Sequence, residues 1–573
     1  MNNASATGLL AQVYRRPIAA LFLFCFVAWL PGFFTIPALD RDESRFVQAS
    51  KQMLETGNFV DIQQGYEKRY KKPVGIYWIQ ATLTAAIDGV RGNTTHGDIW
   101  TYRTASFLGA FTAVALTFWT ASAIAGVETS FLAALLLALS LLLTAESKIA
   151  KTDAVLLATI VGSMGVLLRI YLAEPKETPP RPLPPLWLVL AGWVALGIGL
   201  LVKAPVNVLV IGATVIVLSA WDRSGRWLLD TKPLYGVPLA LLIFLPWLIA
   251  IAIISHGAFF EGSLGHDFAN KISGGEETHG APPGYYTLVA NISFWPTTLF
   301  LLPGVLFAIR NRADDGVRFL LVWAAATWVM FELAPTKLPH YVLPAYPALA
   351  ILSAMWLTSP TPEVEDGWAK GLRIISIVLF TLVGLAFAGF ILYAPTKFGD
   401  GPPVWLYAGS VVIVVLVLTG AVLAFMGRRS QALAVATAAA LAFYYAAGFG
   451  AVPHLGQLWV TETAANVVAR HARPGDPPVI ASGYQEASMT FRLGTKTHLA
   501  GGAEAANIAA VQGGLALIED GERDAFLEGL SDLNTSATPI DRFSGFNYSR
   551  GRRVNITVYR VNPAYQVTSP PPE

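Results

Sequence analysis

Apolar stretches recur along the chain from residue 17 to residue 452, and polar segments separate them. Most are about 20 residues long, which is enough for an α-helix to cross a hydrocarbon core of ~30 Å. The pattern predicts a polytopic α-helical membrane protein with about 13 transmembrane helices. The predicted spans are residues 17–38, 104–125, 129–146, 153–173, 186–203, 205–221, 234–254, 286–308, 318–334, 341–358, 372–394, 404–426 and 431–452.

Residues 74–90 form a further apolar segment, which we do not assign as a span. The segment is short and follows a strongly charged stretch, and loop parity leads us to expect an interfacial or re-entrant helix. With this assignment the predicted cytoplasmic loops hold more basic residues than the short outer loops that follow the first one, as the positive-inside rule requires, whereas a spanning segment would invert every later loop. Loop parity then places the C-terminal tail on the outer side of the membrane, which would be the periplasm if the protein lies in a bacterial inner (plasma) membrane.

We therefore divide the chain into a transmembrane domain, residues 1–452, and a soluble periplasmic domain, residues 453–573. The transmembrane domain includes a long first periplasmic loop, residues 39–103, with interfacial helices. The second domain mixes β-type and helical patterns, which predicts a small α/β fold. Its predicted strands are Pro478–Gly483, Ser488–Leu493, Leu515–Glu519 and Val554–Val561, and its predicted helices are Thr461–Ala472 and Arg523–Leu530.

The composition supports a membrane protein and excludes some functions. Hydrophobic residues make up 54% of the 573 residues, charged residues make up 14%, and the mean hydropathy is +0.51. The net charge of +2 gives no electrostatic footprint for nucleic-acid binding. Because Cys25 is the one cysteine, the chain can form neither an intrachain disulfide nor a cysteine-based metal site.

Charge is concentrated in the first outer loop, where residues 40–72 hold thirteen charged side chains. Asp42 and Glu43 open a helical pattern soon after the first span. The dipole at a helix N-terminus stabilises a carboxylate and so explains one of them. Two adjacent acids together with Arg45 exceed what capping needs, and this favours a functional role for Asp42.

Further charged residues lie near the ends of apolar runs on the same predicted side of the membrane. Lys72 either binds a phosphate or extends to the lipid headgroups as an interfacial lysine. Asp153 opens the fourth span and either caps it or serves a site. Lys203 lies between two apolar runs, where an unpaired lysine is costly. Lys337 and His340 lie between two later spans.

An external site at the lipid–water boundary suits a substrate that is itself partly lipid, such as a sugar linked to a polyprenyl phosphate. Cations would hold the phosphate leaving group and stabilise the charge that develops on it. A carboxylate would act as a general base and accept the proton of the acceptor hydroxyl.

These residues resemble the motifs of the bacterial aminoarabinose transferase (ArnT-like) family. The first-loop signature of that family is similar to Asp42-Glu43-Ser44-Arg45-Phe46, to the helix that continues to Phe59, to Lys71-Lys72-Pro73 and to Tyr77-Trp78. Its later motifs are similar, in the same order, to Lys151-Thr152-Asp153, Lys203-Ala204-Pro205 and the segment from Lys337 to Pro344. Protein O-mannosyltransferases share the broader C-type glycosyltransferase (GT-C) fold.

The resemblance implies a GT-C fold and a glycosyltransferase that uses a polyprenyl-phosphate sugar donor. At the matching positions it implies that Asp42 is the catalytic aspartate, that Asp153 is a second acidic residue needed in the outer cavity, and that Lys72 contacts the lipid phosphate. We therefore expect Asp42 and Asp153 to be the catalytic residues. The remaining motif residues are implied to bind substrate, and they are Glu43, Arg45, Lys203, Lys337, His340 and Tyr341.

The chain departs from the family at Lys71. The family has a glutamate there, which is associated with a bound divalent ion together with a histidine from a later outer loop. His266 could fill the histidine position, but a protonated Lys71 cannot be a ligand. We therefore expect no required cofactor, and a divalent metal is not favoured. The additional lysine suggests a more anionic donor or acceptor, such as a uronic acid or another phosphate.

We predict an inner-membrane glycosyltransferase that moves a sugar from a polyprenyl-phosphate carrier to a periplasmic acceptor, such as lipid A or another surface glycolipid or glycan, by inverting displacement. An enzyme of the same fold that resembles the protein O-mannosyltransferases is the nearest alternative. A lipid-linked sugar transporter is an alternative of another class. It would need charged groups near the bilayer midplane, where the predicted spans have almost none.

Overall fold

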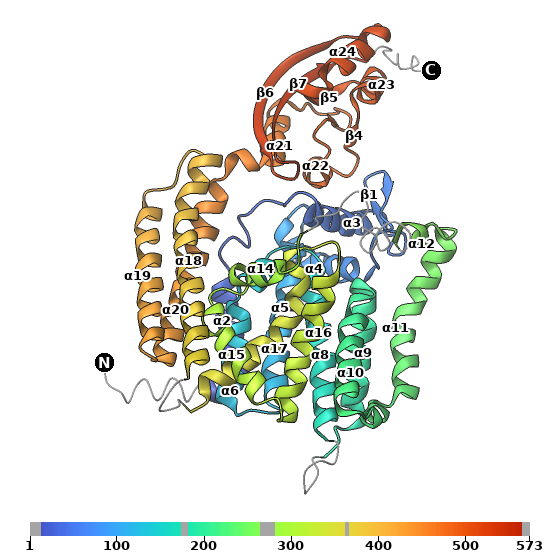
Figure 1. Cartoon of the computed structure of the whole chain (residues 1–573). Coiled ribbons are helices and arrows are strands. Elements are labelled where there is room, and N and C mark those ends of the chain that lie inside the picture. The colour runs from blue at the N-terminus through green and yellow to red at the C-terminus, as the bar shows by residue number, and fades with distance from the viewer. Residues whose placement is uncertain (1–12, 174–181, 264–280, 361–365, 564–573) are drawn as a thin grey trace.

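A computed structural model describes residues 13–173, 182–263, 281–360 and 366–563. Within these ranges nine helices are long and apolar enough to cross a membrane, and four shorter apolar helices coincide with the remaining predicted spans. Most of them stand side by side in one bundle (Figure 1). The prediction of a multi-pass helical membrane protein is therefore confirmed.

The nine long helices are α5 (Ile99–Ala121), α8 (Asp153–Leu172), α9 (Leu186–Lys203), α11 (Pro233–Ile254), α16 (Asp315–Leu333), η3 with α17 (Pro339–Ala345 and Tyr346–Thr358), α18 (Gly367–Phe398), α19 (Trp405–Phe425) and α20 (Arg429–Tyr445) with its continuation to His454. The four shorter ones are α2 (Pro17–Trp29), α6 (Val127–Leu139), α10 (Val206–Asp222) and α15 (Thr298–Arg310). Short helices α7 (Leu141–Glu146), η1 (Arg226–Thr231), α12 (Ala258–Phe260) and α14 (Tyr285–Ser293) connect them.

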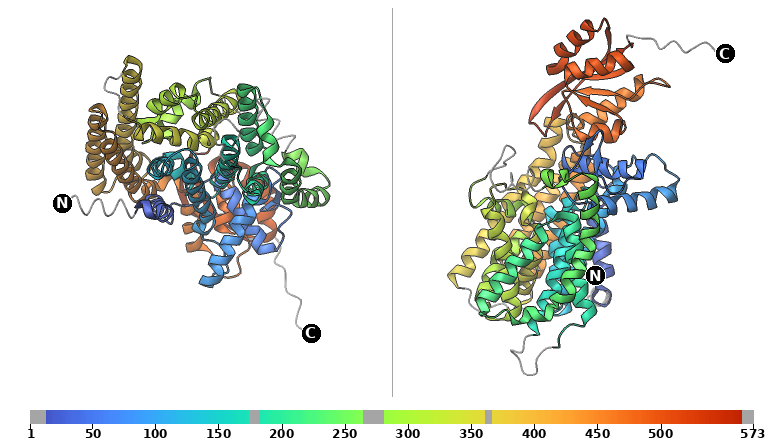
Figure 2. Two further views of the ribbon diagram at one scale, coloured as in Figure 1. Left: turned by 90° about the horizontal axis from the view of Figure 1, so that it is seen from below. Right: turned by 90° about the vertical axis from the view of Figure 1, so that its right-hand side faces the viewer.

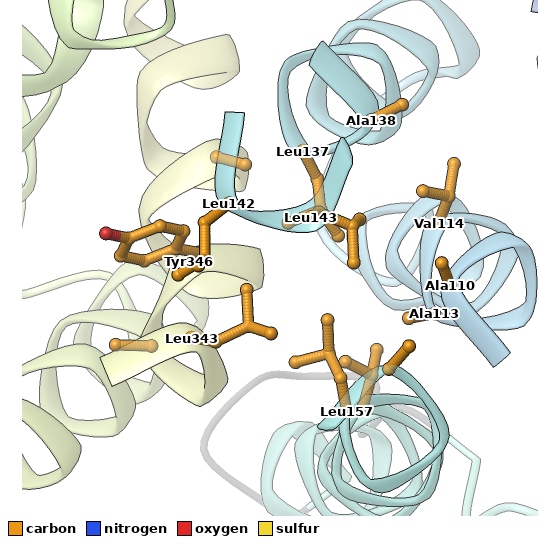
Figure 3. Packing of buried hydrophobic residues seen from close by; sticks show 14 of the residues in the cluster. Ala110, Ala113, Val114, Leu137, Ala138, Leu142, Leu143, Leu157, Leu343 and Tyr346 are labelled. Atoms are coloured by element: carbon orange, nitrogen blue, oxygen red, sulfur yellow. The ribbon is translucent and has the colours of Figure 1, made fainter. Parts of the chain in front are cut away.

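Close packing in the bundle depends on small residues, as is usual for membrane helices. A side-chain carbon at Gly109 of α5 would lie 2.8 Å from the backbone nitrogen of Val155 in α8, so any larger residue would push the two helices apart. Buried alanine, valine and leucine side chains of α5, α6, α7 and α8 meet Leu343 of η3 and Tyr346 of α17 (Figure 3). Leu157 and Leu343 belong to this core and also line the cavity described below, so bundle packing fixes part of its wall.

Two helices of the first loop lie across one end of the bundle. They are α3 (Asp42–Thr56) and α4 (Gly75–Arg91), and a two-stranded ribbon of β1 (Gln63–Gln64) and β2 (Glu67–Lys68) lies between them in the chain. In the right-hand view of Figure 2 these blue segments project sideways beneath the C-terminal domain. The predicted helix at residues 74–90 coincides with α4, which is not among the helices long and apolar enough to cross a membrane. Its place relative to the bilayer stays a prediction.

A buried ion pair fixes the start of α3 against the bundle. The carboxylate of Glu43 accepts hydrogen bonds from Nε and Nη2 of Arg103 in α5 at 2.8 and 3.0 Å. It also accepts from the backbone N–H groups of Leu39 and Ala150, each at 2.9 Å. Arg103 donates further hydrogen bonds to carbonyls within residues 33–37. Because the charges are paired and hydrogen-bonded, the pair can lie in the interior, where it joins the first loop to α5 and to the segment before α8.

The chain after the bundle forms a mixed five-stranded sheet with helices on both faces. The strand order is β4-β3-β5-β7-β6, with β3 parallel to β4 and β5, and β7 antiparallel to β5 and β6. Helices α21 and α22 share one buried apolar cluster with the sheet, and α23 and α24 share another on the opposite face. The strands are β3 (Ile480–Ser482), β4 (His498–Ala500), β5 (Gly514–Glu519), β6 (Ala537–Asn547) and β7 (Arg552–Val561). The helices are α21 (Val460–His471), α22 (Ala487–Leu493), α23 (Gly502–Gln512) and α24 (Arg523–Asp532).

The predicted α/β fold of this region is confirmed, with one error in its elements. Three predicted strands coincide with β3, β5 and β7, and both predicted helices coincide with α21 and α24. The predicted strand Ser488–Leu493 is wrong, because this segment is the helix α22. A run of six residues does not distinguish helix from strand by its periodicity. As a helix, it turns Ser488 and Phe491 toward the first loop. The boundary at residue 453 stays a prediction.

The C-terminal domain packs on the first loop through α22 and the segment after it. Phe491 shares a buried cluster with Val47 of α3, and its carbonyl accepts a hydrogen bond from Nζ of Lys51 at 3.2 Å. Asp40 is buried in the same interface. Burial raises the pKa of its carboxyl to about 6, although hydrogen bonds from Ser488 and Tyr484 act in the opposite direction.

The buried pair leads to a prediction about stability. Replacing Glu43 with glutamine should lower the free energy of unfolding by about 3–5 kcal/mol, because Arg103 would stay buried without a counter-charge. The measurement is the thermal unfolding midpoint of the purified protein. In the double variant Glu43→Gln/Arg103→Met the loss should be smaller than the sum of the single losses.

The matched control is Glu67→Gln, because Glu67 is exposed on β2 in the same loop. Its midpoint should equal that of the wild type. A Glu43→Gln variant as stable as this control would show that the pair does not hold the loop.

Candidate functional site

A cavity of about 570 Å³ lies among the ends of α8, α9, α10 and α16, and residues of α11, α12 and η3 complete its wall. Much of the wall is apolar and includes Leu209, Phe244, Leu248, Phe260 and Met330. The charged lining is mainly cationic and consists of Lys71, Lys72, Lys203, His340 and Asp153. The cavity therefore suits a ligand that carries both a lipid chain and an anionic group.

One glycine brings two of the lysines to the same part of the cavity. A side-chain carbon at Gly75, the first residue of α4, would lie 2.8 Å from the backbone carbonyl of Leu201 in α9. The start of α4 packs directly on the last turn of α9 because position 75 has no side chain. Lys72 lies just before Gly75 in the chain and Lys203 just after Leu201, so this contact places both lysines beside the cavity.

Asp153 is the centre of an ion-pair cluster. Its Oδ1 accepts a hydrogen bond from Nζ of Lys203 at 2.7 Å and lies 3.9 Å from Nε2 of His340. Its Oδ2 lies 3.7 Å from Nζ of Lys151, and that ammonium group lies 2.8 Å from Oε1 of Glu146. The side chains of Asp153, Lys151 and Glu146 are at most 11% exposed. Their charges therefore interact more strongly than they would in water.

Helix ends explain why these charges meet at one point. Asp153 opens α8, where the positive end of the helix dipole stabilises a carboxylate, and Lys203 closes α9, where the negative end stabilises an ammonium group. The two helices are consecutive and antiparallel, as the contacts Asp153–Lys203 and Ser163–Gly192 show. The first residue of α8 and the last residue of α9 therefore lie side by side.

Asp42 lies near this cluster but does not line the cavity. It is exposed at the first position of α3. Burial alone would lower the pKa of Lys151, but the carboxylates of Glu146 and Asp153, with a smaller contribution from Asp42, raise that pKa above its usual value. Lys151 is therefore protonated at neutral pH and links Asp42 electrostatically to Asp153.

The structure brings five of the predicted site residues together, although their segments are far apart in the sequence. Lys72, Asp153, Lys203, His340 and Tyr341 all line the cavity. Nζ of Lys203 lies 5.7 Å from the centre of the Tyr341 ring, which is within the range of a cation–π interaction.

Other predicted site residues lie elsewhere. Glu43 is held by Arg103 and does not line the cavity, and Arg45 is half-buried on α3 outside the lining. Lys337 is buried, and its Nζ donates a hydrogen bond to the carbonyl of Ala334 at 3.0 Å, at the C-terminal end of α16. His266 lies outside the described residues.

The residues that line the cavity do not fit the divalent ion that the family resemblance implies. Lys71 occupies the position of the expected carboxylate and lines the cavity as an exposed ammonium group. Within the described parts of the chain, no group of three or more His, Cys, Asp or Glu side chains could hold a metal ion.

Sequence reasoning missed two features of this site. Glu146 was not identified, although an acid at the end of an apolar run, five residues before Lys151, is a signal that an ion pair is needed there. The aromatic side chains Phe244, Phe259 and Phe260 were also missed. Apolar wall residues have no signal of their own, because every spanning helix is rich in them.

The comparisons with known proteins agree with this geometry. Residues 15–257 match the family model described as dolichyl-phosphate-mannose-protein mannosyltransferase. An undecaprenyl phosphate-alpha-4-amino-4-deoxy-L-arabinose arabinosyl transferase of Edwardsiella ictaluri is 28% identical over 428 residues, which are 72% of this chain and 72% of that protein. An uncharacterised protein of Aquifex aeolicus is 27% identical over 61% of this chain, and the match spans 65% of its length.

The fold is also that of a solved structure. ArnT from Cupriavidus metallidurans, bound to undecaprenyl phosphate, superimposes with a TM-score of 0.73 at 18% sequence identity, over 97% of this chain and 99% of that one. At this identity the superposition shows the fold. Together with the relatives it confirms the predicted resemblance to the ArnT-like family and the predicted GT-C fold.

Proposed function

We propose that this chain is an inner-membrane glycosyltransferase that moves a sugar from a polyprenyl-phosphate carrier to an acceptor at the periplasmic face. The observation that carries the proposal is the cavity, in which lysines meet long apolar walls. A lipid phosphate needs both features at the same place. The relatives named as arabinosyl transferases, and the ArnT structure with undecaprenyl phosphate, support a carrier of this chemical class.

Lys72 and Lys203 would hold the phosphate of the donor. Both line the cavity, and Lys203 is oriented by Asp153 and lies over the ring of Tyr341. Because Lys203 is fixed before the reaction, it can stabilise the negative charge that grows on the leaving phosphate without reorganising, and Lys72 would add a second positive charge. Asp153 would then act by holding Lys203 and by bordering the sugar.

Asp42 would serve as the general base. It is exposed, so a large acceptor can reach it, and the cation Lys151 connects it to the cluster that surrounds the donor. The acceptor hydroxyl would attack the anomeric carbon from the face opposite the phosphate and give its proton to Asp42. The bond from the anomeric carbon to the phosphate oxygen would break, the new glycosidic bond would form, and the configuration would invert.

The acceptor that we propose is lipid A or another surface glycolipid or glycan, by analogy with the arabinosyl transferase relatives. A protein hydroxyl is the second candidate, because the matching family model is described as a protein mannosyltransferase. Incubating the same labelled donor with lipid A, with surface glycan and with peptide acceptors would separate these cases.

The first test removes the proposed base. Asp42→Asn should lower turnover by roughly 10²–10⁴-fold with the thermal midpoint unchanged, because the exposed side chain contributes to proton transfer and not to packing. The measurement is the transfer rate of labelled sugar by the purified enzyme. Glu67→Gln, an exposed acid of the same loop, is the control and should keep full turnover. Near-normal turnover of Asp42→Asn would remove the base assignment.

The second test concerns the phosphate. Lys72→Ala should raise the KM for the donor more than Lys72→Arg does, because arginine keeps the charge while alanine removes it. Binding of the carrier phosphate alone, without the sugar, should weaken in the same order. If the two variants have equal and negligible effects, Lys72 is an interfacial lysine without a role in binding.

The third test identifies the sugar class. Lys71 lines the cavity beside Lys72 and adds a positive charge that a neutral or cationic sugar does not need. We therefore expect a panel of polyprenyl-phosphate donors to show preference for a sugar that carries a carboxylate or a further phosphate. Lys71→Glu should reduce that preference. A wild-type preference for a cationic amino sugar would contradict the expectation.

A further inference from the structure

The C-terminal domain holds the two residues that directly precede Asp42. The hydroxyl oxygen of Tyr548 accepts a hydrogen bond from the backbone N–H of Asp40 at 2.5 Å. On the other side, the hydroxyl group of Tyr484 donates to Oδ2 of Asp40 at 2.6 Å, and Ser488 donates to Oδ1. The side chain and the backbone of Asp40 are therefore both fixed by residues that follow it by more than 440 positions.

The next residue, Arg41, has a backbone conformation that needs support. Its φ of +64° lies in the left-handed region, which a residue other than glycine rarely adopts. Such a conformation persists only where the surroundings enforce it. Nη2 of Arg41 donates a hydrogen bond at 2.6 Å to the carbonyl of Ser549, which is again in the C-terminal domain. The domain thus holds the side chain of the strained residue as well as the residue before it.

The bundle holds the opposite side of the same turn. Glu43 is fixed by Arg103, and the backbone N–H of Ser44 donates to the carbonyl of Leu39 at 3.1 Å. Asp42 therefore lies between two anchors: Glu43, which is held by the bundle, and Asp40 with Arg41, which are held by the C-terminal domain. Because the Asp42 side chain is exposed and makes no hydrogen bond to a residue in the described part of the chain, these anchors set its position.

We infer that the C-terminal domain is a positioning element of the catalytic site, in which Tyr484, Ser488 and Tyr548 hold Asp40 and Arg41 so that Asp42 is presented to the acceptor. This inference rests on the proposed role of Asp42 as general base. The domain would contribute to the rate without contacting the donor, and its hydroxyl groups would act as positioning residues through Asp40.

The test compares hydrogen bonds of the same interface at two distances from Asp42. Tyr548→Phe and Ser488→Ala each remove one hydroxyl group that contacts Asp40. The matched control is Thr495→Val, because Thr495 of the same domain hydrogen-bonds Gln48 and Glu55 further along α3 at 2.9 and 2.6 Å. Tyr548→Phe and Ser488→Ala should lower kcat by about 10–100-fold with the KM for the donor unchanged, because a base displaced by a fraction of an ångström loses its alignment. Thr495→Val should keep kcat.

Hydrogen exchange of the full-length protein gives a second readout that does not depend on turnover. Backbone amides of residues 40–46 should exchange faster in Tyr548→Phe than in the wild type and should be unchanged in Thr495→Val. Equal exchange in all three proteins would overturn the inference. An equal fall of kcat in Thr495→Val and Tyr548→Phe would overturn it too, because the domain would then act by general docking.

Wild type and Asp42→Asn are assayed in parallel. A failure of the proposed base Asp42 can then be distinguished from a failure of the positioning role of the C-terminal domain. If the wild type transfers sugar and Asp42→Asn does not, unchanged kcat in Tyr548→Phe and Ser488→Ala would contradict the positioning role alone. If Asp42→Asn is fully active, the proposed base is wrong, and the inference falls with it.

Discussion

The ion pair between Asp153 and Lys203 is the interaction on which the architecture of the site depends. Charges at the border of a bilayer are costly unless they are paired. Nζ of Lys203, the last residue of α9, lies 2.7 Å from Oδ1 of Asp153, the first residue of α8. This contact gives each charge a partner and joins the two helix ends. Lys151, Glu146 and His340 extend the pair into a cluster, so that residues from three separate loops share one set of charges. Lys203, which faces the cavity, is therefore held in place by Asp153, and a cation fixed in this way can stabilise nearby negative charge without reorganising.

A second constraint separates the two adjacent acids of the first loop. Glu43 is buried and bound to Arg103, whereas Asp42 is exposed. The two residues look equivalent in the sequence, yet Glu43 joins the first loop to the bundle, whereas the side chain of Asp42 is accessible to solvent. The C-terminal domain fixes the chain on the other side of Asp42, because Tyr484 and Ser488 of that domain donate hydrogen bonds to the buried carboxylate of Asp40.

Much of the fold follows from the sequence because a bilayer leaves few alternatives. The candidate spanning helices could be predicted from apolar length alone. The prediction that segment 74–90 does not span the membrane came from loop parity and the positive-inside rule. The ordered motifs also identified Lys72, Asp153, Lys203 and His340, which the structure places around one cavity. The side chain or carbonyl that each charged residue contacts could not be predicted. Nothing local in the sequence tells that Glu43 meets Arg103 or that Lys337 binds the carbonyl at the end of α16, because these contacts arise from tertiary packing. The error at Ser488–Leu493 has the same origin, since a six-residue run took its conformation from the loop on which it packs.

The most direct measurement of the central claim is a structure of the protein determined with a polyprenyl-phosphate sugar. The account predicts that the phosphate lies in the cavity within hydrogen-bond distance of Lys72 or Lys203, that the lipid chain follows the wall formed by Phe244 and Leu248, and that the anomeric carbon faces Asp42. A phosphate bound outside this cavity, or an anomeric carbon turned away from Asp42 by the lipid, would contradict it.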